Sequence, residues 1–323
     1  MGAVAALVSA LLWAATSTAL TALSARSSAV VLSGVRLGAA TVCIPLVVVL
    51  AGGTREFTGA TPAVVFALVA SGVLGYGIGD TAYIRSLSLL GMQRVFPVSI
   101  AGYIGLTVLG SGIFLGEPLD AMLVLGAGLI ALGIALVVVS SAERPLEGIP
   151  VSGPAPPALE AFADLGPLVV LPRRLPRWAS RNIEGYALVG LVSLTWAGAT
   201  LWLAWAGNEL GAVGTWAIRT PVGAAGLLLV SFATRRARLR ALVTDRNQLT
   251  IVVVAGIVGT AFGSLCYVFA VVEIGAARAA VLSATSPLMA LPLALVFLKE
   301  RITVRVLAGT LACVAGIALV VGA

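Results

Sequence analysis

Residues 3–22 read AVAALVSALLWAATSTALTA, a stretch without a charged side chain. Residues 186–206 read YALVGLVSLTWAGATLWLAWA and are equally apolar, again with a tryptophan near the middle. A helix that crosses about 30 Å of hydrocarbon needs about 20 apolar residues. Both stretches therefore predict membrane-spanning helices, and their similarity indicates an internal repeat.

Apolar runs of this length recur along the whole chain. They lie near 3–22, 29–51, 63–87, 94–115 and 119–139, and again near 186–206, 211–232, 249–272, 277–298 and 303–322. The first run has no basic segment before it and is followed by others of its kind, so we expect a retained helix and not a cleaved signal peptide. The sequence thus predicts an all-α membrane protein with ten transmembrane helices.

The overall composition also favours lipid as the solvent. Of 323 residues, 60% are hydrophobic and only 10% are charged, and the mean hydropathy is +1.10. One soluble core cannot bury that much apolar surface. The isoelectric point of about 10.0 would suggest nucleic acid in a soluble protein. Here the basic residues lie between apolar runs, so we interpret them as topology determinants and expect no nucleic-acid partner.

Missing residues and motifs disfavour several functions. The chain has no histidine, so it can form neither a Ser-His-Asp triad nor an imidazole metal site. Cys43, Cys266 and Cys313 lie in apolar runs without CxxC spacing, which supports neither a disulfide framework nor a metal cluster. No GxxxxGK(S/T) motif is present, which excludes ATP hydrolysis by this chain. We therefore expect no enzyme, no metal and no cofactor, and energy from a gradient or from exchange.

Residues 140–185 interrupt the apolar pattern and divide the chain into repeats at 1–139 and 186–323. The interruption combines eight prolines with charges of both signs, a composition that resists regular structure. It is predicted to be a linker. Two interpretations stay open for residues 162–178, which either rest on the membrane surface or form an unstructured tether.

The internal repeat is the strongest signal in the sequence. A shift of 183 residues superimposes Trp13 on Trp196, Arg36 on Arg219, Glu117 on Glu300, Gly126 on Gly309 and Gly133 on Gly316. Between these anchors a shift of 184 matches Gly75, Gly79, Tyr83, Gly91 and Arg94 with Gly259, Gly263, Tyr267, Gly275 and Arg278. An odd number of spans per repeat inverts the second copy in the bilayer. In inverted-repeat transporters the substrate site lies near the midplane, between the repeats.

The second repeat carries a recognisable pattern. It begins with Gly275-Ala-Ala-Arg278, passes through Ser286-Pro287 to Lys299-Glu300-Arg301, and continues into a glycine-spaced last helix. It resembles the EamA domain of ten-helix drug/metabolite exporters in the drug/metabolite transporter superfamily, over essentially all the chain except the linker. The first repeat departs from it, with Gly102-Tyr103 in place of Ser286-Pro287. The resemblance implies export or exchange of small organic solutes, including amino acids and drugs.

Three charged residues lie well inside predicted spans. Arg36 and Arg219 lie about eight residues, or about 12 Å, into their helices. Each either attracts an anionic group into a central cavity, or snorkels to the interface or bonds another helix. Asp80 aligns with Ser264 and is a candidate for substrate binding and for proton coupling. The alternative is a fixed pair of Asp80 with Arg36 or Arg85.

Aromatic residues complete the candidate substrate site. Trp13, Trp196, Tyr83 and Tyr267 recur in both repeats, whereas Tyr76 and Tyr103 do not. Such side chains either line a pocket for an amphipathic solute or pack in the core. Glu117 and Glu300 are assigned to structure, as caps near the connections into the fifth and tenth helices, and Pro287 to the mid-helix Ser-Pro motif.

The sequence as a whole predicts a secondary transporter in a prokaryotic inner membrane that exports or exchanges a small metabolite by alternating access. The alternatives are a lipid or polyprenyl-carrier translocase and a non-transporting membrane protein that binds a ligand. The expected partners are the lipid bilayer and a small-molecule substrate. Because basic residues stay cytoplasmic, we expect a cytoplasmic linker with both termini outside.

Overall fold

The computed structural model describes residues 1–24, 28–52, 57, 60–90, 92–142, 177–286, 288–289 and 304–322. All elements in these ranges are helical, which confirms the all-α class. The first half contains α1 (Gly2–Ser24), α2 (Ala29–Val42), α3 (Ile44–Leu50), α4 (Pro62–Gly72), the π-helix η2 (Val73–Gly79), α5 (Asp80–Leu90), α6 (Met92–Gly110), the π-helix η3 (Ser111–Leu115) and α7 (Ala121–Ala142). The second half contains α9 (Arg177–Thr244), α10 (Arg246–Ala255), the π-helix η4 (Gly256–Phe262), α11 (Gly263–Ser283) and α13 (Val304–Gly322).

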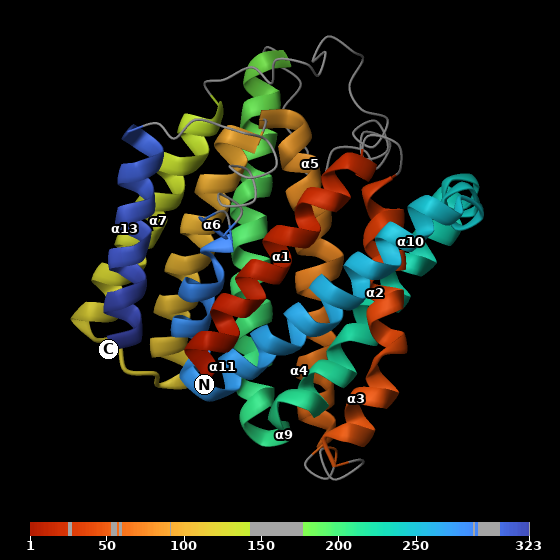
Figure 1. Cartoon of the computed structure of the whole chain (residues 1–323), viewed down its shortest axis with the longest axis horizontal. Helices are drawn as coiled ribbons and strands as arrows, with labels where there is room; N and C mark the ends of the chain where they lie inside the picture. The colour runs from red at the N-terminus through yellow and green to blue at the C-terminus, as the bar shows by residue number, and fades with distance from the viewer. Residues whose placement is uncertain are drawn as a thin grey trace.

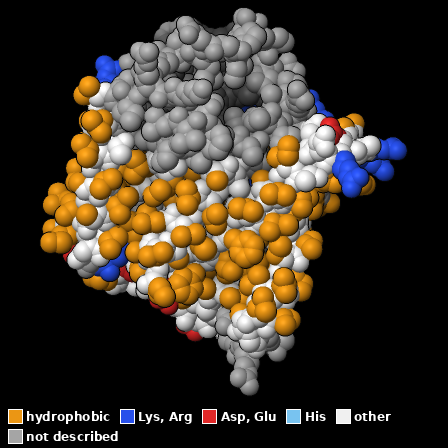
Figure 2. Space-filling view, in the orientation of Figure 1, with side chains coloured by type: hydrophobic (Ala, Val, Ile, Leu, Met, Phe, Trp, Pro, Cys, Tyr) orange, Lys and Arg blue, Asp and Glu red, His pale blue; other side chains and the backbone are white. Residues whose placement is uncertain are grey.

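Several of these helices suit a lipid environment. Within the described ranges, five stretches are long and apolar enough to cross a membrane: Val30–Leu50, Pro62–Tyr83, Val98–Leu115, Asn182–Thr244 and Arg246–Ser283. Figure 2 shows hydrophobic side chains across the middle of one face and a cluster of basic side chains at its upper right. The protein is therefore a multi-pass membrane protein, whereas the count of ten spans stays a prediction.

Two of the five stretches are too long for one crossing. The 63 residues of Asn182–Thr244 would measure about 95 Å as one straight helix, at 1.5 Å per residue. The backbone breaks instead at Gly211, with φ 78° and ψ 174°, and α11 breaks similarly at Gly275, with φ 83° and ψ 166°. Only glycine adopts such positive φ values without strain. In Figure 1 α9 accordingly runs down the molecule, turns and rises again.

The expected span at 29–51 also has a local break, because α2 ends before Cys43 and α3 begins after it. Pro45 lies in the first turn of α3, where its missing N–H is tolerated, whereas inside a continuous helix it would remove a hydrogen bond. The expected span at 63–87, by contrast, is continuous helix from Pro62 to Leu90 through η2.

Helices of the first half pack mainly against helices of the second. α7 packs along α13, α1 along α11, and both α2 and α4 along α9, and Figure 1 shows α7 beside α13. The α7–α13 contact depends on glycine. A Cβ at Gly126 would lie 2.8 Å from the carbonyl oxygen of Gly316, and one at Gly133 would lie 2.5 Å from that of Gly309. Gly126 thus contacts Gly316 and Gly133 contacts Gly309, so each glycine of α7 meets the repeat mate of the other.

Candidate functional site

The candidate site is organised around Asp80, the first residue of α5. The indole of Trp196, on α9, donates its Nε1–H to Oδ1 of Asp80 over 3.2 Å. Arg36 and Arg219 both interact electrostatically with this carboxylate. Among the described residues, however, no ion pair within 4.0 Å joins either arginine to Asp80. The three charges therefore share one region of the helix bundle without a closed salt bridge.

Arg219 is bound tightly by the protein itself. It is 7% exposed, its Nη1 donates to the hydroxyl of Tyr76 over 3.3 Å, and its guanidinium lies 4.5 Å from the centre of the Tyr76 ring. The Tyr76 hydroxyl is also 3.1 Å from Oγ of Ser264, on α11. This chain of contacts joins η2, α9 and α11, so it links the two halves.

A second hydrogen-bonded group lies beside Trp196. The hydroxyls of Tyr103 and Tyr267 are 2.7 Å apart, and Thr200 Oγ1 lies 2.9 Å from Tyr267 and 3.4 Å from Tyr103. The Trp196 ring meets Tyr103 edge to face at 6.2 Å and Tyr83 at 5.2 Å between ring centres. These aromatic rings and hydroxyls form a wall that suits a solute with an apolar part and a polar end.

Arg36 and Trp13, the repeat mates of Arg219 and Trp196, are arranged differently. The guanidinium of Arg36 lies 5.4 Å from the centre of the Trp13 ring. Its Nε, like that of Arg219, is buried without a hydrogen-bond partner, and no hydrogen bond from its guanidinium occurs among the described residues. Trp13 is 43% exposed, so this ring is accessible from outside the protein core. The two aligned arginine–tryptophan pairs therefore differ in their bonding.

Close backbone approach places both arginines. A Cβ at Gly72 would lie 2.9 Å from the carbonyl oxygen of Arg219, and one at Gly256 would lie 2.5 Å from that of Arg36. Each glycine adjoins or begins a π-helix, η2 or η4, and π-helical turns are frequent at functional sites. The same contact thus occurs once around each arginine.

All nine candidate substrate-site residues from the sequence lie in this network of contacts: Trp13, Arg36, Tyr76, Asp80, Tyr83, Tyr103, Trp196, Arg219 and Tyr267. Sequence reasoning missed Thr200 and did not assign Ser264 to the site. Both residues could have been predicted from the sequence, because Ser264 aligns with Asp80 and Thr200 lies one helical turn after Trp196. Their roles in binding stay proposals.

Glu117 is a helix cap, but for a different helix than its sequence position suggested. Its two carboxylate oxygens accept the backbone N–H groups of Ala276 and Ala277 over 2.6 and 3.1 Å. The break at Gly275 leaves these amides without helical partners. The fifth helix, α7, is capped instead by Asp120, which accepts from the Leu123 amide over 2.7 Å. Pro287 and Glu300 lie outside the described residues.

Two ion pairs join the halves away from the cluster. Arg85 on α5 contacts Glu184 on α9 over 2.8 Å, and both side chains are nearly buried. Arg278 contacts Asp120 over 3.3 Å in a more exposed position. The alternative ion pair of Asp80 with Arg85 is not observed among the described residues, where Arg85 pairs with Glu184.

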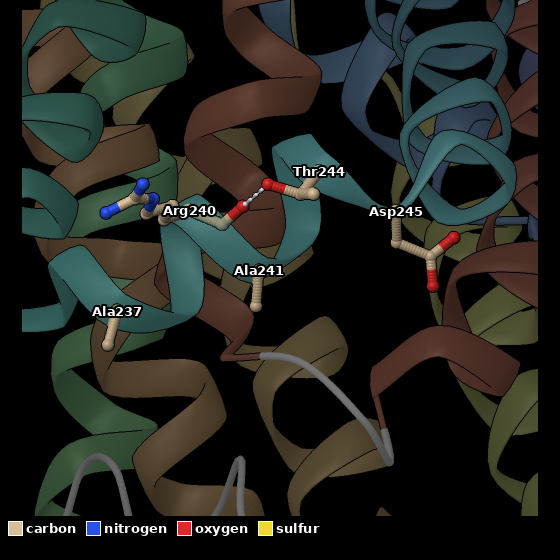
Figure 3. Close-up of a pocket in the computed structure, with 5 residues that line it drawn as sticks. All are labelled: Ala237, Arg240, Ala241, Thr244 and Asp245. Atoms are coloured by element: carbon tan, nitrogen blue, oxygen red, sulfur yellow. Dashed lines mark hydrogen bonds between the residues drawn. The ribbon is translucent and has the colours of Figure 1, made fainter.

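Neither described pocket adjoins the cluster. A shallow depression of about 600 Å³ lies at the α9–α10 turn, lined by Ala237, Arg240, Ala241, Thr244 and Asp245. In Figure 3 Thr244 is hydrogen-bonded to the backbone of Arg240, and the charged groups of Arg240 and Asp245 lie far apart. A second space of about 40 Å³ lies beside Glu117 and Arg278. No group of three or more His, Cys, Asp or Glu side chains suits a metal ion in the part of the chain that is described.

Comparisons with known proteins agree with this architecture. Among 26 matching chains of solved structures, one described as "Crystal structure of protein" aligns over 98% of this chain and 95% of its own. Its TM-score is 0.66 and its identity 17%, which shows a shared fold alone. No curated protein matches the sequence. The sequence does match the EamA-like transporter family, over residues 1–139 and 183–322. Because these two matches cover most of the chain, the protein belongs to the EamA-like transporter family and is a membrane transporter of the drug/metabolite type.

Proposed function

We propose that this protein is a secondary transporter that exports or exchanges a small organic solute across a prokaryotic inner membrane. The solute binds at the Asp80 cluster, between two inverted five-helix repeats at 1–139 and 186–323 that are joined by the linker at 140–185. Alternating access exposes the cluster first to one side of the membrane and then to the other. The breaks at Gly211 and Gly275 support ten spans, because each divides a helix that is too long for one crossing.

One observation carries the proposal: charged side chains and aromatic hydroxyls from both halves meet in a single network. Tyr76 contacts Ser264, Asp80 contacts Trp196, and Tyr103 contacts Tyr267. Ionisable groups inside membrane helices are costly and typically mark substrate or ion pathways. A network whose contacts cross between the halves would have to rearrange when the halves rock against each other, as alternating access requires.

Asp80 is proposed to couple transport to protons. In the described structure it is the only carboxylate within the network, it interacts electrostatically with Arg36 and Arg219, and it forms no closed ion pair with them. A carboxylate in this setting can exchange a proton with whichever side the site faces. The alternative role is purely structural, in which Asp80 only offsets the charge of the arginines.

The test compares Asp80→Asn with the native protein in proteoliposomes, with and without a pH gradient. Asparagine cannot titrate, but its amide oxygen still accepts a hydrogen bond from Trp196. We therefore expect a thermal midpoint near the native value, loss of gradient-driven flux and surviving exchange. Glu209→Gln, at an exposed carboxylate, is the matched control and should transport normally.

Three results would contradict the proposal in different ways. Native gradient-driven flux in Asp80→Asn would remove the coupling role. A variant that is poorly stable, with residual flux that still follows the gradient, would identify Asp80 as a structural counter-charge, since removing one partner of buried charges costs about 3 kcal/mol or more. Native protein that moves no solute from a broad panel would remove the transport function itself.

A further inference from the structure

Each repeat supplies an arginine and a tryptophan at matching positions. Among the described residues, only Arg219 and Trp196 donate side-chain hydrogen bonds to other protein groups. Arg219 donates to Tyr76 and stacks on its ring, and Trp196 donates to Asp80. Arg36 and Trp13 contact each other, yet no hydrogen bond from either side chain occurs among the described residues. The buried Nε atoms of Arg36 and Arg219 both lack a partner, so the difference between the arginines is the Nη1 donation of Arg219 to Tyr76. The pair formed by Arg36 and Trp13 therefore has unused bonding capacity.

The unsatisfied polar groups of Arg36 and Trp13 are all hydrogen-bond donors. A guanidinium carries five N–H donors and no acceptor, and an indole carries one N–H donor and no acceptor. A ligand that satisfies these groups must present acceptors only, which is the property of an ionised carboxylate or a phosphate. An ammonium group would meet no acceptor on either side chain and would be repelled by Arg36.

Charge balance selects between the two anions. With Asp80 ionised, the network holds two guanidinium groups, of Arg36 and Arg219, against one carboxylate, so in that state it carries one excess positive charge. A buried charge is costly unless it is paired. A carboxylate with one negative charge balances this excess, whereas a phosphate monoester carries a charge of about −1.5 to −2 at neutral pH. The indole face of Trp13, which is partly exposed, adds a flat apolar surface beside the cation.

We infer that Arg36 and Trp13 form the anion-binding part of the site, and that the substrate is a monocarboxylate with a flat apolar body. This inference rests on the proposed transport function and deepens it. Arg36 binds the carboxylate, and Trp13 packs against the apolar body. Arg219 and Trp196, by contrast, are positioning residues that hold Tyr76 and Asp80 in place.

The test measures equilibrium binding to the purified full-length chain with three radiolabelled probes of the same size: phenylacetate, phenylacetamide and 2-phenylethylamine. These share one ring and differ in charge, being anionic, neutral and cationic at pH 7. We expect phenylacetate to bind at least about tenfold more tightly than either of the others, because a hydrogen bond to a charged group is worth about a factor of ten or more.

Variants test whether Arg36 causes the preference for phenylacetate. Arg36→Gln should retain a native thermal midpoint, since it removes no described hydrogen bond, yet should bind phenylacetate at least about tenfold more weakly. Its repeat mate Arg219→Gln should melt earlier, because it loses the Tyr76 contacts. Arg36→Lys keeps the charge and should still prefer phenylacetate over the amine, which keeps the test decisive if the glutamine variant folds poorly.

Three results would overturn the inference: equal or tighter binding of 2-phenylethylamine, native phenylacetate affinity in Arg36→Gln, or no saturable binding of any probe. The assay needs no flux, so it separates the two proposals. Saturable phenylacetate binding that depends on Arg36, in a protein that transports nothing, would leave the site intact and remove the transport function. Transport of a cationic solute by a protein that does not bind phenylacetate would keep the transport function and remove the anion site.

Discussion

Substituting Glu117 by alanine removes the cap of the helical segment that follows Gly275. Its carboxylate accepts two backbone N–H groups, from Ala276 and Ala277, at 2.6 and 3.1 Å. A hydrogen bond to a charged group contributes about 1.5–3 kcal/mol. Because Glu117 is only half-buried, we take the lower part of that range and expect a loss of about 3–4 kcal/mol for the two bonds.

The measurement is the apparent thermal midpoint of purified protein in detergent. A loss of this size lowers the midpoint by about 6–16 °C, at the value of about 2–4 °C per kcal/mol for domains of 150–250 residues. Glu117→Gln keeps one acceptor oxygen without the charge and should fall between the alanine variant and the native protein.

Asp120→Asn is the control for charge at the same end of the molecule. Its ion pair with Arg278 is partly exposed and such pairs contribute about 0–1 kcal/mol, so its midpoint should change little. If Glu117→Ala melted within one degree of the native protein, or no lower than Asp120→Asn, the cap would carry no stability and the reasoning would be refuted.

Three further predictions use other contacts. Gly133→Ala places a Cβ 2.5 Å from a carbonyl oxygen and a sulfur of α13 and should cost about 1–3 kcal/mol in stability. The control Gly128→Ala, on the same helix, meets nothing within 4 Å and should be neutral or stabilising. Equal thermal midpoints of the two variants would contradict close packing of α7 against α13. Arg85→Gln strands a nearly buried carboxylate on Glu184 and should cost about 3 kcal/mol or more, and adding Glu184→Gln should restore much of that loss; additive losses in a double-mutant cycle would argue against the pair. The positive-inside rule predicts a cytoplasmic linker and external termini, so a C-terminal alkaline phosphatase fusion should be active and a C-terminal green fluorescent protein fusion dark, with the opposite pattern reversing the orientation.

Much of the fold could be predicted from the sequence because the bilayer imposes a simple rule. A helix satisfies all of its backbone hydrogen bonds internally, so each apolar run in lipid becomes helical whatever its neighbours are. The helices α1, α6 and α13 accordingly match the expected runs at 3–22, 94–115 and 303–322 to within a few residues. Local breaks were harder to foresee, because the positive φ at Gly211 and Gly275 depends on where the chain must turn.

The sequence by itself determined the membrane class, the internal repeat and which polar residues would be buried among apolar ones, because hydropathy and alignment act along the chain. The tertiary structure alone decided which partner each residue has. Arg36 and Arg219 are identical in the alignment, yet only Arg219 donates to Tyr76, and Glu117 caps amides 159 and 160 residues away. Hydrogen bonds depend on distances of about 3 Å in space, and no one-dimensional pattern specifies those distances between helices packed from opposite halves of the chain.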